Sequence, residues 1–147
     1  MGFITLLFSN KLLSATFLSW FVAQFLKVML VYLGSRELDV SRFFGSGGMP
    51  SSHSSSIVTL ATCILRKYGY SSTEFALAAV FSIIVMYDAS GVRLAASHHA
   101  IILNKILDIF EDGESWNGKL KELLGHTPLE VLAGAILGVI VGMLVQV

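Results

Sequence analysis

Residues 127–147 have the sequence TPLEVLAGAILGVIVGMLVQV, a nearly unbroken apolar stretch that opens with a Thr-Pro pair typical of a helix start. A helix needs about 20 apolar residues to cross a bilayer, so the stretch predicts a membrane-spanning helix. Gly134, Gly138 and Gly142 recur at every fourth position. They therefore share one helix face, which lets another helix approach closely and leaves room for a homodimer. The alternative is that these glycines are merely tolerated in lipid.

The composition of the whole chain also indicates a membrane protein. Of its 147 residues, 54% are hydrophobic and 14% are charged, and the mean hydropathy is +0.74. Soluble domains carry about 25% charged residues. The formal net charge is zero, which gives no basic excess for nucleic acid. We expect one domain over residues 1–147, in the plasma membrane of a bacterium or an organelle membrane of a eukaryote, with membrane lipids as its neighbours.

Three further apolar segments precede the last one. With it, the approximate spans are 12–33, 54–66, 74–96 and 127–147. The second segment is short and carries several Ser and Thr residues, so it either spans the membrane packed against protein or re-enters it. We favour spanning, because it brings the unusual polar residues to one side. The predicted fold class is an all-α integral membrane bundle of about four transmembrane helices.

The polar interval at residues 97–125 separates the last two spans. Apolar residues among polar ones at positions 101–110 predict an amphipathic helix that lies on the membrane surface. Residues 119–124 predict a short second amphipathic piece, which Gly125 stops. His98 and His99 are adjacent, and neighbouring residues of a helix point about 100° apart, so we expect no metal site there.

A small uncharged loop, Gly47-Gly48-Met49-Pro50-Ser51-Ser52-His53-Ser54, lies between the first two spans. Its glycines and serines leave backbone N–H groups unshielded, and a following helix would present its first amides to the same place. Such an arrangement binds anions. Gly48, Ser51 and Ser52 are the candidate phosphate-binding residues of this loop. His53 adds an ionisable group, although it could also be an ordinary hydrogen-bonding residue at a helix start.

Threading four spans through a bilayer places Lys27, His53, Arg93 and His126 on one side. Charged residues within spans cost roughly 2.5–3.5 kcal/mol each on insertion and indicate function by default. Lys27 and Arg93 are therefore candidates to bind phosphate oxygens. Lys27 could instead extend to the headgroups, and Arg93 could instead neutralise Asp88.

His126 and Glu130 are four residues apart, one helical turn on the same face. A carboxylate at one ring nitrogen sets the tautomer and leaves the other nitrogen free to attack phosphorus. This spacing makes His126 the candidate nucleophile and Glu130 its orienting partner. His53 has no acidic residue at such a spacing, so it is left as the general acid.

Three ordered motifs resemble one family. Pro50-Ser51-Ser52-His53 is similar to the Pro-Ser-Gly-His signature of the type-2 phosphatidic acid phosphatases, and His126-x-x-x-Glu130 is similar to the end of their third motif. Lys27 matches the lysine of the first motif. Together these motifs resemble the divergent branch, also called acid phosphatase/vanadium-dependent haloperoxidase-related. The resemblance implies a helical membrane protein, a histidine nucleophile, no obligatory metal or other cofactor, and lipid or polyprenyl phosphates as substrates.

The chain departs from the pattern of that family at its arginines. The position of the first-motif arginine is Gly34, and that of the third-motif arginine is Leu120. Arg93 is the expected replacement, with Arg36 and Arg42 as weaker ones. We therefore expect a lipid-phosphate or polyprenyl-(di)phosphate phosphatase that acts through a phosphohistidine. The alternative is a non-catalytic membrane protein that binds or moves anionic phospholipids with a degenerate phosphatase pocket.

Overall fold

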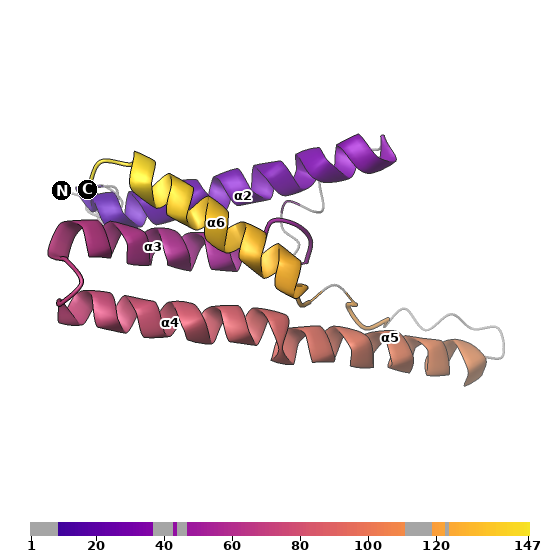
Figure 1. Cartoon of the computed structure of the whole chain (residues 1–147). Helices are drawn as coiled ribbons and strands as arrows, with labels where there is room; N and C mark the ends of the chain where they lie inside the picture. Colours follow the sequence, from indigo (N-terminus) through magenta and orange to yellow (C-terminus); the bar gives the residue numbers. More distant parts are fainter. Residues whose placement is uncertain (1–8, 37–42, 44–46, 111–118, 123) are drawn as a thin grey trace.

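The computed structural model describes residues 9–36, 43, 47–110, 119–122 and 124–147. These residues form an all-helical structure without strands. In chain order the helices are α2 (Lys11–Ser35), α3 (Ser52–Tyr68), α4 (Thr73–Ser90), α5 (Val92–Phe110) and α6 (Pro128–Leu144). Helices α2, α3, α4 and α6 form a bundle, and α5 continues beyond it from the end of α4 (Figure 1). The predicted all-α fold class is confirmed.

Short polar side chains start these helices. The Asn10 side chain accepts hydrogen bonds from the first amides of α2, and Ser51 and Ser72 accept one each from α3 and α4. Thr127 and Glu130 form a reciprocal capping box at the start of α6. Such caps satisfy amides that have no acceptor within the helix. The bounds of the bundle helices are therefore encoded locally.

Helix α3 lies at the centre of the bundle and packs against α2, α4 and α6. Its buried side chains are mostly small and polar, which explains why the segment is weakly apolar: protein, not lipid, surrounds it. The Thr59 hydroxyl donates a hydrogen bond to the Gly138 carbonyl at 3.0 Å, and its oxygen also lies 2.7 Å from the Ser19 hydroxyl. Ser19 in turn lies 2.5 Å from the Ser55 hydroxyl. These bonds join three helices where water is excluded.

The glycine face of α6 packs against α3. A Cβ atom added at Gly138 would lie 2.6 Å from the Ser55 carbonyl oxygen, and one added at Gly142 would lie 2.7 Å from Thr62 Cβ. At Gly134 it would collide with the Ser51 carbonyl oxygen. The expected close helix approach is thus present, and its partner is α3 of the same chain. A homodimer would have to use another surface.

The outward faces of the bundle are apolar. Two helical stretches, Lys11–Ser35 and Thr73–Ile109, are long and apolar enough to cross a membrane, and Pro128–Leu144 is a shorter apolar helix. Large exposed side chains cover these helices, among them Phe17 and Phe21 on α2, Phe81 on α4 and Ile136 on α6. A surface of this kind is suited to lipid and not to water. The chain is a helical membrane protein.

The interval after α4 differs from the expectation at two places. The helix break falls at Gly91, so α5 starts at Val92 instead of near residue 101. The 18 residues of α4 already span about 27 Å, close to the thickness of the hydrocarbon layer. The predicted second amphipathic piece at 119–124 is not helical at its described residues, because side chains of α5 bind its backbone. Residues 111–118 and 123 lie outside the described part.

Candidate functional site

The two candidate histidines meet at one end of the bundle. His53 is the second residue of α3, and His126 lies two residues before α6. Their ring centroids are 5.9 Å apart, with the ring planes at 68°. His126 is fully buried, and His53 is half-buried with its Nδ1 atom buried. Residues 73 positions apart in the sequence therefore share one buried space.

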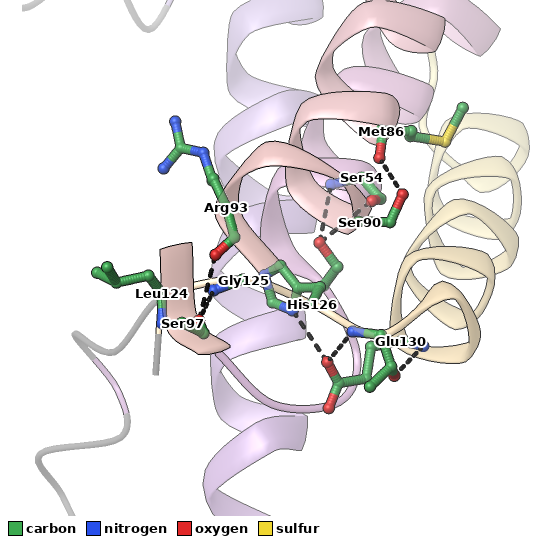
Figure 2. Close-up of polar contacts among 11 residues, drawn as sticks. Ser54, Met86, Ser90, Arg93, Ser97, Leu124, Gly125, His126 and Glu130 are labelled. Carbon is green, nitrogen blue, oxygen red and sulfur yellow. Dashed lines mark hydrogen bonds and ion pairs between the residues drawn. The ribbon is translucent and has the colours of Figure 1, made fainter. Parts of the chain in front are cut away.

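Glu130 lies beside His126, as the four-residue spacing predicts. Its Oε2 atom is 3.4 Å from His126 Nδ1 and also accepts a hydrogen bond from the Thr127 amide at 2.9 Å (Figure 2). Glu130 thus belongs both to the capping box of α6 and to the surroundings of the imidazole. The same arrangement fixes the start of the helix and the position of the carboxylate.

Burial lowers the pKa of the His126 imidazole below its ordinary value. The Glu130 carboxylate opposes this shift, while the nearby Lys27 and His53 reinforce it. The imidazole is therefore uncharged at neutral pH, the form that has a lone pair free for attack. Its Nδ1 atom faces Glu130, and its Nε2 atom makes no hydrogen bond within the described residues. The site thus holds a buried base with unused bonding capacity.

Lys27 of α2 lies in the interior next to the loop that precedes α3, with 1% of its surface exposed. A Cβ atom at Gly48 would contact the Lys27 side chain at 3.4 Å, and Gly48 has φ of +96°, a conformation that favours glycine. The lysine stem therefore runs along this loop and does not extend to the headgroups. Its charge reaches His126, so Lys27 belongs to the site.

Ser51 and Ser52 have different roles at the start of α3. The Ser51 amide donates to the Glu130 carbonyl at 3.0 Å, and its hydroxyl accepts from the Ser54 amide at 3.3 Å. Ser51 therefore joins α3 to α6 and does not offer its amide to a ligand. The next two amides, those of Ser52 and His53, begin the helix and have no acceptor within it. They are the candidate anion-binding groups.

Arg93 is oriented differently from the other candidates. Its Nε atom pairs with Asp88 Oδ2 at 2.5 Å, with both side chains about half exposed. Figure 2 shows its side chain directed away from His126. The structure therefore shows the alternative stated above, in which Arg93 neutralises Asp88. The weaker replacement Arg36 is exposed at the end of α2, and Arg42 lies outside the described residues.

A strap, defined as residues 119–122 and 124–126, brings His126 to the site along α5. The buried Asn104 side chain bonds both backbone groups of Leu120 at 2.9 Å. The Ser97 hydroxyl accepts from the amides of Leu124 at 3.0 Å and Gly125 at 2.9 Å (Figure 2). Neither side chain was expected to contribute to the site, although both are polar residues within a helix that also carries many apolar ones.

The last contacts of the strap set the position of His126 itself. Its amide donates to the Ala89 carbonyl at 2.9 Å. A Cβ atom at Gly125 would collide with the backbone of Leu94, so the strap lies directly on α5. His126 is thus held through its backbone at the α4–α5 junction, and Glu130 at the start of α6 lies beside its ring. The described residues hold no group of three metal-ligating side chains.

The fold and the site define a helical membrane protein in which two histidines and a lysine meet at one end of a bundle. The profile of the divergent PAP2 family matches residues 8–141, and the chain belongs to this phosphatase-related family of membrane proteins. The chain is 38% identical over 130 residues to the uncharacterized membrane protein YuiD of Bacillus subtilis strain 168. The aligned region covers 80% of this chain and 82% of YuiD. No solved structure matches this chain.

Proposed function

We propose that the protein is a membrane lipid-phosphate or polyprenyl-(di)phosphate phosphatase that acts through a phosphohistidine intermediate on His126. The observation that carries the proposal is the buried imidazole pair, 5.9 Å between centroids, with the buried Lys27 nearby. A base, a second imidazole and a cation in one buried space are the groups that phosphoryl transfer uses. Membership of a phosphatase-related family supports the same reaction.

In the proposed first step, the free Nε2 atom of His126 attacks phosphorus, and the bond between phosphorus and the leaving oxygen breaks. His53 donates a proton to that oxygen, which leaves as an alcohol or, from a diphosphate, as a monophosphate. Glu130 stabilises the positive charge that develops on the His126 ring. In the second step His53 takes a proton from water, the water oxygen bonds to phosphorus, and the nitrogen–phosphorus bond breaks.

Phosphate would be held by groups on two helices. The Lys27 ammonium and the first amides of α3, from Ser52 and His53, would donate to its oxygens. Gly48 would let the loop backbone approach. Arg93 would join them only by exchanging Asp88 for the phosphate, which costs the energy of an existing ion pair. We therefore assign Arg93 a smaller effect on turnover than Lys27.

The test is release of phosphate by detergent-purified protein given phosphatidate, phosphatidylglycerophosphate and polyprenyl diphosphates. Wild type should release phosphate and carry an acid-labile label from a radioactive substrate, whereas His126→Ala should do neither. His99→Ala is the matched control, because His99 is exposed on α5. Equal release by wild type and His126→Ala would refute the mechanism.

The pairing of Arg93 with Asp88 favours a second candidate. Without a free arginine at the phosphate position, the pocket could bind or move anionic phospholipids without hydrolysis. Vanadate binding that depends on Lys27, together with no turnover of any substrate above, would support this function. Turnover that His126→Ala abolishes would exclude it.

A further inference from the structure

A groove runs between α4 and α6 on the outer surface of the bundle. Its volume is about 400 Å³. Its apolar walls include Ile83 and Met86 from α4 and Val131, Leu132 and Ala135 from α6. Such a groove is suited to a hydrocarbon ligand.

The groove exists because α4 and α6 both pack on α3 and barely contact each other. The glycine face of α6 is turned toward α3. On α4, the buried residues Ala78 and Ser82 face α3, where the Ser82 hydroxyl reaches the Ile57 carbonyl at 3.4 Å. The larger side chains of both helices therefore flank a gap between them.

One end of this groove reaches the candidate site. Its lining includes Ser90, next to Ala89, whose carbonyl oxygen accepts the His126 amide at 2.9 Å. It also includes Pro128, two residues after His126. Figure 2 shows Met86 and Ser90 on the part of α4 near α6 and His126. This end of the groove thus lies beside the residues that hold the backbone of His126.

The rest of the groove opens sideways. Leu132 is 57% exposed and Ile83 is 64% exposed, so the walls face the hydrocarbon layer along their length. A ligand seated here would reach the groove from the bilayer, with its polar end at the site and its apolar part between the helices.

We propose that the α4–α6 groove binds one hydrocarbon chain of a phosphorylated lipid whose phosphate lies at His126. This inference rests on the proposed function and narrows its substrates to long-chain lipid phosphates. The occupant is the chain of the substrate, because one end of the groove lies beside the residues that hold His126. A bilayer lipid without a phosphate would make apolar contacts with the groove walls but no polar contacts at the site.

The kinetic test uses Ala135→Phe, which places a ring in the groove. For a long-chain phosphatidate we expect KM to rise about tenfold, while kcat/KM for the short substrate para-nitrophenyl phosphate stays within twofold. Ile136→Phe is the matched control, since Ile136 is the next residue, is 55% exposed and does not line the groove. Equal effects of Ala135→Phe on both substrates, or of both variants on phosphatidate, would overturn the inference.

A second measurement does not depend on turnover. Wild-type protein receives a non-hydrolysable phosphonate lipid with a photoreactive diazirine in mid-chain, and the labelled peptides are mapped. We expect labels on α4 and α6, reduced at least fivefold by Ala135→Phe and by removal of the phosphonate group. Equal labelling by the corresponding alcohol would identify a bystander lipid and overturn the inference. Phosphonate-dependent labelling without any turnover would retain it and reject the phosphatase function.

Discussion

The two sides of α6 are built in opposite ways. Toward α3, Gly134, Gly138 and Gly142 bring the two backbones into direct contact. Toward α4, larger side chains keep the helices apart and leave a groove of about 400 Å³. Close packing without side chains gives a fixed distance, whereas flanking side chains leave space for a ligand. In the proposed function, the tight side positions the two histidines and the open side admits a lipid chain.

The contact between α3 and the glycine face of α6 is called the seam, and it is structurally connected to the candidate site. The Ser51 amide, two residues before His53, donates to the Glu130 carbonyl, and Gly134 lies against the Ser51 carbonyl oxygen. The position of α6 along the axis of α3 therefore also sets the position of His126 relative to His53. A shift of one helix along the other would separate the imidazoles.

The largest effect is expected from breaking the seam. Gly138→Ala would place a methyl group 2.6 Å from the Ser55 carbonyl oxygen, so the helices must separate, at a cost of about 3 kcal/mol. Gly34→Ala is the control, because nothing lies within 4 Å of a Cβ atom there. Unfolding in detergent should show a large loss of stability for the first variant and none for the second. Equal stabilities would mean that the seam is loose.

The second effect concerns the strap. Ser97→Ala leaves the amides of Leu124 and Gly125 without their acceptor, which should lower stability by about 1–3 kcal/mol. If the strap positions His126, kcat should fall at least tenfold while KM stays unchanged, and Ser97→Thr should restore it. Thr16→Ala is the control, since that hydroxyl donates to the Leu12 carbonyl of its own helix α2. A change in stability alone would limit Ser97 to a structural role.

The third prediction separates the two roles of Glu130. Glu130→Gln keeps a side chain that can complete the capping box but removes the carboxylate that opposes the lowered pKa of His126. The pKa should then fall further. In the proposed mechanism activity rises as His126 loses its proton, so the acid limb of kcat against pH should move to lower pH, with a reduced plateau. An unmoved limb would show that His126 is not the group that titrates.

The smallest effect is expected at the far end of the seam. Arg66 donates hydrogen bonds to the carbonyls of Gly142 at 2.7 Å and Val145 at 2.6 Å. Arg66→Gln should lower stability by about 1 kcal/mol and leave turnover unchanged, because the site lies at the other end of the bundle. Lys67→Gln is the control. A fall in kcat without a loss of stability would contradict this separation.

Much of the fold could be predicted from local patterns. The apolar segments, the glycine face and the Thr-Pro helix start are properties of consecutive residues, and the spacing of His126 and Glu130 is a property of one helical turn. The strap could not be predicted in this way. Ser97 and Asn104 bind backbone groups at positions 120–125, and no periodicity links those stretches. The pairing of Arg93 with Asp88 was one of two alternatives that spacing alone left open.

The sequence by itself determined that this chain lies in a membrane, that its helices begin at particular caps, and that Glu130 lies beside His126. Each of these depends on composition or on residues within about one helical turn. Only the tertiary structure decided that α3 takes the glycine face of α6, that Lys27 is buried beside the loop before α3, and that His53 lies next to His126. Those contacts depend on which helices pack together and on their relative positions along the helix axes. Side chains from distant segments determine both the partners and the positions.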